Sequence, residues 1–123
     1  MEQLASLFFH SRTQAHVFHL GVKGPGSFAA HKALQEYYEG IVDLIDGLVE
    51  SYQGKNGLIK FQVVNGIDNN CDIKNIISYF EKLCKALEKL RKDDKLQDSW
   101  IQNDIDNIAT LLYSRKYKLE NLA

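Results

Sequence analysis

Apolar residues recur at helical spacing along four stretches of this chain. Between residues 28 and 53 they fall three or four positions apart, the spacing of one buried stripe of a helix in a bundle, at Leu34, Tyr38, Ile41, Ile45, Leu48 and Tyr52. The other stripes are Leu4, Phe8, Ala15, Phe18 and Val22; Ile73, Ile76, Phe80, Leu83, Leu87 and Leu90; and Ile101, Ile105, Ile108 and Leu112. Four amphipathic helices predict an all-α four-helix bundle.

Glycine, proline and capping residues set the expected helix ends. The first helix is expected from about residue 2 to 22, ending at the run GVKGPGS, with Ser27 as N-cap of the second. The second helix is expected from about residue 28 to 53, with Gly54 just past its end. The third is expected over about 71–91. The fourth begins near Ser99, where Ser99-x-x-Gln102 has the form of a capping box.

The stretch from about residue 55 to 70 is the least regular part of the chain. Asn-Gly pairs at 56–57 and 65–66 flank LIKFQVV, which predicts either a short strand or a loop lying over the bundle. This makes the connection between the second and third helices the longer one. No linker is long enough to divide the chain, so residues 1–123 are expected to form a single domain.

Composition narrows the class of protein. The chain is 45% hydrophobic and 25% charged, as in ordinary soluble proteins, and it has no run of about eighteen apolar residues that could span a membrane. A formal net charge of −1 argues against broad attraction to nucleic acid or membranes. The sequence begins without a basic segment before its first apolar patch, which predicts no secretory signal. Cys71 and Cys84, in a predicted helix, are expected to be reduced thiols in a cytoplasmic protein.

A second, polar stripe runs beside the apolar stripe of the second helix. It consists of His31, Gln35, Glu39, Asp43, Asp46 and Glu50. Histidine and carboxylate on the edge of a buried face are the ligands with which helical bundles build transition-metal sites. The alternative is a solvated acidic stripe with histidines that hydrogen-bond locally.

Helix geometry restricts how such a site could form. His31 and Asp46 are fifteen residues apart on one helix, which is about 22 Å along its axis. A metal–ligand bond is only about 2 Å long. One chain therefore cannot bring both to one ion, whereas a second copy packed antiparallel, with its two-fold axis near residues 38 and 39, places His31 opposite Asp46 of its partner. Any metal site is predicted to lie between subunits.

The segment His19-Leu-Gly-Val-Lys-Gly-Pro-Gly-Ser-Phe-Ala-Ala-His31 resembles the loop between the first two helices of Dps-type miniferritins, members of the ferritin-like family. In that family a second histidine follows the first by twelve residues, and an Asp-x-x-x-Glu completes the site; Asp46 and Glu50 match it here. The resemblance implies a ferritin-like four-helix bundle. It also implies that His19, His31, Asp46 and Glu50 bind Fe(II) and oxidise it at a two-fold subunit interface, within a homo-oligomer such as a dodecameric shell, for iron storage or oxidative protection.

Across its whole length the chain is similar to short Dps-like proteins of tailed phages, which would place it in the host cytoplasm. It departs from the miniferritin pattern at Gln35, where the family has an acidic ligand, and at Leu20, where the family has tryptophan. The basic N-terminal tail through which some members bind DNA is absent, so DNA binding is not expected. These departures keep open a rival function, a non-enzymatic bundle that serves as a structural or host-protein-binding protein.

Other candidate features have plainer interpretations. His16 and His19 have a chelating spacing, but His16 is expected at the surface or an interface. The glycines of residues 21–27 could cradle an anion, although a plain interhelical turn is favoured. Lysines on the third helix form a basic edge that nearby acids offset, and Trp100 and Tyr113 are expected to pack.

Overall fold

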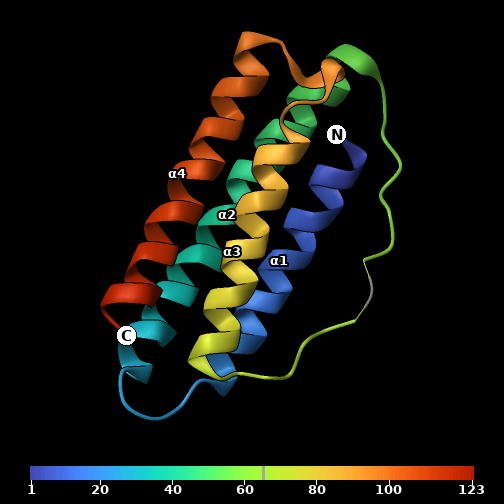
Figure 1. Cartoon of the computed structure of the whole chain (residues 1–123). Coiled ribbons are helices and arrows are strands. Elements are labelled where there is room, and N and C mark those ends of the chain that lie inside the picture. Colours follow the sequence, from blue (N-terminus) through green and yellow to red (C-terminus); the bar gives the residue numbers. More distant parts are fainter. Residues whose placement is uncertain (65) are drawn as a thin grey trace.

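A computed structural model describes residues 1–64 and 66–123 and contains four long helices (Figure 1). They are α1 (Glu2–Gly21), α2 (Ser27–Asn56), α3 (Ile73–Leu90) and α4 (Ser99–Asn121), with a short 3-10 helix, η1 (Asp94–Leu96), before α4. The described residues contain no strand. The predicted all-α four-helix bundle is therefore confirmed, as is the longer connection between α2 and α3. None of the described helices has the length and apolarity needed to cross a membrane.

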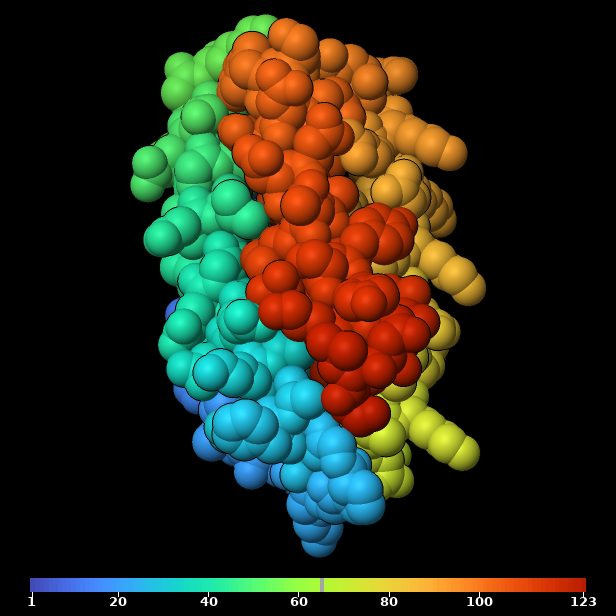
Figure 2. All heavy atoms as spheres, turned by 90° about the vertical axis from the view of Figure 1, so that its left-hand side faces the viewer, coloured from blue at the N-terminus to red at the C-terminus, as the bar shows by residue number. Residues whose placement is uncertain are grey.

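The direction of the helices explains the long connection. α2 and α3 run the same way along the bundle, so the chain after α2 must return along its full length before α3 begins (Figure 1). α1 packs antiparallel against α2, and α4 lies between α2 and α3 on the opposite side (Figure 2). Gly40 allows one close α2–α4 contact, because a Cβ there would lie 3.1 Å from a Leu111 methyl carbon.

The predicted apolar stripes form the core with one correction on α2. Tyr37 is fully buried, whereas Tyr38, which the periodicity placed in the stripe, is only partly buried. One hydrogen bond satisfies the buried Tyr37 hydroxyl. Ser11 Oγ donates to the Phe8 carbonyl at 2.7 Å and accepts from the Tyr37 hydroxyl at 2.7 Å. Burial disfavours the charged form of Tyr37 more than the hydrogen bond to Ser11 favours it, so the pKa of Tyr37 is raised well above its ordinary value. Ser11 on α1 thus provides the hydrogen-bond partner for a buried tyrosine that apolar spacing alone did not select.

Both ends of α2 differ from the prediction. The N-cap position is Gly26, at φ +79°, and Ser27 is the first helical residue. The helix continues through Gly54 to Asn56 and ends at Gly57, at φ +87°. A left-handed conformation costs glycine little, which makes Gly57 the better stop. A Cβ at Gly54 would meet no atom within 4 Å, so that position is open to solvent and imposes no break.

The capping box predicted at the start of α4 is also wrong. Asp98 occupies the N-cap position, and no side chain caps the helix. The Gln102 amide instead donates to the carbonyls of Arg91 and Leu96 at 3.0 and 2.8 Å, fastening the α3–α4 connection. Trp100 and Tyr113, expected to pack, are 37% and 43% exposed.

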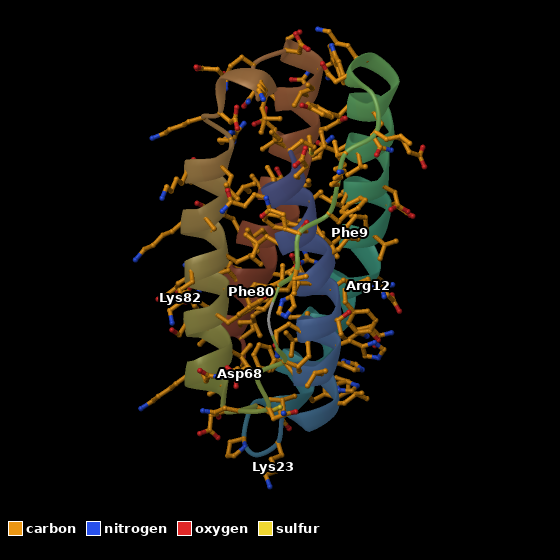
Figure 3. The ribbon with its side chains drawn as sticks, turned by 90° about the vertical axis from the view of Figure 1, so that its right-hand side faces the viewer. Phe9, Arg12, Lys23, Asp68, Phe80 and Lys82 are labelled. Atoms are coloured by element: carbon orange, nitrogen blue, oxygen red, sulfur yellow. The ribbon has the colours of Figure 1, made fainter. Side chains whose placement is uncertain are left out.

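Residues 57–64 and 66–72, here called the strap, lie along the outside of α1 (Figure 3). Three polar residues at successive turns of α1 hold the strap backbone. Ser6 Oγ accepts from the Gln62 amide at 2.7 Å, and the Gln14 side chain exchanges two 2.8 Å bonds with the Asp68 backbone. His10 Nε2 lies 2.6 Å from the Gly66 carbonyl and donates to it.

The loop alternative for residues 58–64 is therefore confirmed, and the strand alternative is wrong for those residues. The predicted turn at 65–66 includes residue 65, which lies outside the described residues. α3 begins at Ile73, so Cys71 belongs to the strap and not to a helix; both cysteines are free. Burial raises the pKa of Cys84, on α3, to about 11, which keeps that thiol protonated.

Candidate metal centre

Two histidines fasten the last turn of α1 to the first turns of α2. His19 Nδ1 lies 2.7 Å from the His31 carbonyl, and His31 Nδ1 lies 2.8 Å from the His19 carbonyl. Their rings stack with centroids 3.5 Å apart and planes inclined by 21°. The His19 carbonyl lies in the final turn of α1, where carbonyls lack an intrahelical partner. The bond from His31 therefore also caps that helix.

The reciprocal bonds fix which ring nitrogen carries the proton. A carbonyl oxygen can only accept, so in each histidine Nδ1–H must be the donor. In the neutral imidazole the lone pair then resides on Nε2, the nitrogen that a metal would bind. Histidine ligands of metals usually donate their other nitrogen to a backbone carbonyl or carboxylate in this way, which holds the ring in place. His19 and His31 are thus chemically suited to be ligands, and their tautomers are set before any ion arrives.

Two further rings adjoin the histidine pair. His16 is exposed and stacks on Tyr38 at 4.2 Å with planes 13° apart, while Tyr38 meets the edge of His19 at 5.3 Å. His16 and His19 approach edge to face at 5.9 Å. His16 is therefore at the surface, as expected, and Tyr38 supports this ring cluster, which explains its absence from the core.

Asp46 and Glu50 lie away from the histidines. α2 is one continuous helix from Ser27 to Asn56, so the fifteen residues from His31 to Asp46 span about 22 Å. Both carboxylates are exposed. Within the residues described, no three His, Cys, Asp or Glu side chains come close enough together to hold a metal ion. The structure of one chain thus brings the predicted ligands together as two separate pairs, and whether a second copy joins these pairs stays a prediction.

Other polar side chains of α2 near His31 form hydrogen bonds and ion pairs of their own. Gln35 donates to Glu39 Oε1 at 3.0 Å. Glu36 instead faces α4, where Lys118 and Arg115 lie 3.0 and 3.1 Å from its Oε1. The hydrogen bond from Lys118 and the nearby positive charges lower the pKa of Glu36. Glu36 is therefore engaged in interhelical ion pairs with α4.

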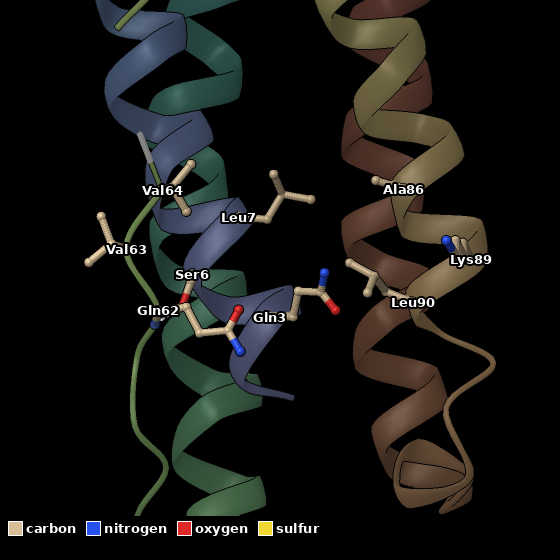
Figure 4. Close-up of a pocket in the computed structure, with 9 residues that line it drawn as sticks. All are labelled: Gln3, Ser6, Leu7, Gln62, Val63, Val64, Ala86, Lys89 and Leu90. Carbon is tan, nitrogen blue, oxygen red and sulfur yellow. Dashed lines mark hydrogen bonds between the residues drawn. The ribbon is translucent and has the colours of Figure 1, made fainter. Parts of the chain in front are cut away.

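A groove of about 490 Å³ opens between the N-terminal half of α1, the strap and the C-terminal half of α3 (Figure 4). Its lining is Gln3, Ser6, Leu7, Gln62, Val63, Val64, Ala86, Lys89 and Leu90. No His, Cys, Asp or Glu is among these residues. The groove therefore contributes nothing to the metal chemistry expected of the histidine pair.

The sequence indicated the histidine pair by its spacing but not the bonds that orient it. It gave no sign that His10 bonds the strap, because that partner is fifty-six residues away. The alternative prediction, that the histidines hydrogen-bond locally, is correct for Nδ1 of both residues. These bonds do not involve Nε2 of either ring, so both a structural role and a ligand role are compatible with them.

Comparison with known proteins gives partial matches. Over 37 residues the chain is 49% identical to the DNA protection during starvation protein of Helicobacter pylori (strain J99 / ATCC 700824). That alignment covers 30% of this chain and only 26% of the relative, so the chain matches about a quarter of that protein's length. No solved structure matches. A family model matches residues 24–119, which is most of the chain. The chain therefore belongs to the family of unknown function DUF5856.

Proposed function

We propose that this protein is a Dps-like miniferritin that binds Fe(II) at two-fold subunit interfaces and oxidises it, for iron storage or oxidative protection. The observation that carries the proposal is the His19–His31 pair, in which both rings donate from Nδ1 and keep Nε2 for a ligand bond. The 49% identity to a DNA protection during starvation protein over 37 residues supports the same assignment.

The four residues have distinct roles in this proposal. His19 and His31 of one copy supply neutral nitrogen ligands that suit Fe(II). Asp46 and Glu50, one helical turn apart, supply anionic oxygen from the second copy. Anionic oxygen favours the more highly charged Fe(III), so these carboxylates lower the free energy of the oxidised product relative to Fe(II). With peroxide as oxidant, each of two Fe(II) ions gives up one electron, and the peroxide with two protons leaves as two waters.

Anaerobic titration with Fe(II), followed by addition of peroxide, tests the proposal. We expect saturable binding of about one or two ions per subunit and rapid oxidation, both lost in Asp46→Asn. Asp43→Asn is the matched control, because Asp43 is an exposed carboxylate on the same helix outside the predicted ligand set. An assembled protein that binds no Fe(II), or an Asp43→Asn variant as damaged as Asp46→Asn, would contradict the assignment.

One observation favours a second function, a non-enzymatic bundle without iron chemistry that serves as a structural or host-protein-binding protein. The Gln35 amide occupies the position of an acidic ligand and is bonded to Glu39. An amide is a weak ligand for iron and carries no charge to balance Fe(III). Gln35→Glu separates the two functions: it should strengthen Fe(II) binding in a working miniferritin and leave a non-binding bundle without uptake.

A further inference from the structure

The groove between α1, the strap and α3 has aliphatic walls (Figure 4). Leu7 of α1 and Leu90 of α3 extend toward each other across it, and Ala86, which faces Leu7, contributes only a methyl group. Val64 of the strap adds a further aliphatic side chain, and all four residues are partly buried. The volume of about 490 Å³ lies within the range of about 300–1,000 Å³ that is typical of small-ligand sites. The groove can therefore cover an aliphatic chain.

The charge of the groove is positive and has no partner within it. Lys89 is the one charged residue of the described lining, and no ion pair in the described part of the chain involves it. The acids nearest to Lys89 in the sequence are engaged elsewhere. Glu88 accepts a hydrogen bond from Tyr113 of α4 at 3.5 Å, and Asp93 accepts one from the Lys95 amide at 2.9 Å. A cation beside aliphatic walls is complementary to an anionic head on an aliphatic chain.

The other end of the groove limits where such a head can lie. Gln3 and Gln62 line both the groove and a smaller neighbouring pocket of about 220 Å³, which also contains Glu2, Asp93 and Lys95. Charges of both signs are present in that pocket, so it does not select an anion. Within the groove the two carboxamides can donate to a head group, but only Lys89 offers a charge. The position beside Lys89 is therefore the one that favours an anionic head.

We propose that this groove binds a single-chain anionic amphiphile of the fatty-acid class, with its carboxylate at Lys89 and its aliphatic chain between Leu7, Ala86 and Leu90. Burial of the chain supplies most of the affinity, and each methylene removed from water tightens binding by about fourfold. The exposed Lys89 contributes less and selects the sign of the head. The groove shares no residue with the candidate metal centre, so this inference goes beyond the proposed function and does not depend on it.

Isothermal titration of the full chain with decanoate, below the concentration at which decanoate forms micelles, tests the proposal. We expect saturable binding of about one molecule per chain. Along the series hexanoate, octanoate and decanoate, affinity should rise by about fourfold for each added methylene. Decyltrimethylammonium has the same chain length with a positive head, and it should bind more weakly than decanoate because Lys89 repels it.

Two variants locate the binding site. Ala86→Leu fills the space opposite Leu7 and should abolish decanoate binding. Lys89→Gln should weaken decanoate binding by about two- to fivefold and leave the binding of uncharged decanol unchanged. Lys85→Gln is the matched control, because Lys85 is an exposed lysine of the same helix that lines a different pocket, beside Tyr113. It should bind decanoate as the unmodified chain does. If Ala86→Leu fails to fold, the comparison of the two lysine variants still decides.

Several results would overturn the inference. Uptake of decanoate that rises without saturation, or equal losses in Lys85→Gln and Lys89→Gln, would show that the groove does not recognise the ligand. Binding to phosphatidylglycerol vesicles without binding of free decanoate would assign this face to a membrane. A dimer that forms without ligand and that Ala86→Leu dissociates would assign the groove to a second copy of the chain.

Discussion

Two regions of α1 use histidine to hold a neighbouring segment, and they leave different ring nitrogens without a hydrogen bond to the backbone. Along the strap, His10 donates from Nε2 to the Gly66 carbonyl. Near the C-terminal end of the same helix, His19 donates from Nδ1 to the His31 carbonyl, and His31 donates from Nδ1 to the His19 carbonyl. Donation from Nε2 leaves the lone pair on Nδ1, next to the backbone, whereas donation from Nδ1 leaves the lone pair on Nε2, at the outer end of the ring. The choice of ring nitrogen therefore decides whether the nitrogen that could bind an ion lies next to the backbone or at the outer end of the ring.

The largest expected effect comes from removing the outer nitrogen alone. In His19→Asn the side-chain amide takes the position of Nδ1–H and keeps the bond to His31, but no Nε2 remains. We expect Fe(II) affinity to fall by at least about 100-fold, with thermal stability nearly unchanged, because direct ligands matter at least as much as the supporting groups whose loss costs about 10–100-fold. Isothermal titration and calorimetric unfolding measure the two quantities.

His10→Gln is the matched variant in the other region. The glutamine amide takes the position of Nε2 and keeps the bond to Gly66, so Fe(II) affinity should match that of the unmodified chain. Comparable losses of affinity in the two variants would show that the ring nitrogen is not what distinguishes the two regions.

The next effect concerns the strap. Gln14 is 1% exposed and makes both bonds to the Asp68 backbone. Gln14→Ala leaves the Asp68 amide and carbonyl without these partners, which should lower the free energy of unfolding by about 1–3 kcal/mol. Urea unfolding measures this loss, and Fe(II) oxidation should persist, since the histidine pair is untouched. Thr13→Ala, at the exposed neighbouring position, should leave stability nearly unchanged; a loss of oxidation in Gln14→Ala would instead couple the strap to the site.

A smaller effect depends on pH and concerns the end of the strap that meets α3. Bonds from the Asn75 side chain and the Asn70 amide lower the pKa of Asp68. The folded-state pKa lies below the unfolded one, so the stabilisation is present above the unfolded value of about 3.9 and is lost as the pH falls through the folded value. Hydrogen exchange should show the Asn70 amide losing protection in that acid range. Asp68→Asn should lack this pH dependence, and an unchanged acid profile would assign the effect to another group.

The smallest expected effect is at the edge of the ring cluster. His16 is exposed and stacks on Tyr38 without a hydrogen bond among those described. His16→Ala should change the free energy of unfolding by no more than about 0.5 kcal/mol and leave the number of bound Fe(II) ions per subunit unchanged. If His16→Ala bound fewer Fe(II) ions per subunit, His16 would be a third nitrogen ligand beside His19 and His31.

Local patterns were enough to predict the four helices. Burial of one apolar stripe of each helix is the main source of stability, and the spacing of that stripe can be read directly from the sequence. Ile101, Ile105, Ile108 and Leu112 lie in the core as predicted. The spacing of His19 and His31 was also enough to select them as a pair. The same helix geometry showed that His31 and Asp46 are too far apart to share an ion in one chain, since rise per residue is a local property.

Tertiary contacts decided the rest. Tyr37 replaces Tyr38 in the core because Ser11 on another helix accepts a hydrogen bond from the Tyr37 hydroxyl. α2 runs past Gly54 because nothing packs against that position. Gln102 donates to two carbonyls of the α3–α4 connection and does not form the capping box predicted for α4. The free Nε2 atoms of the histidine pair depend on carbonyls that only the α1–α2 packing supplies. A pattern along the chain specifies which residues are buried, but the partner of each polar atom exists only once distant segments have met.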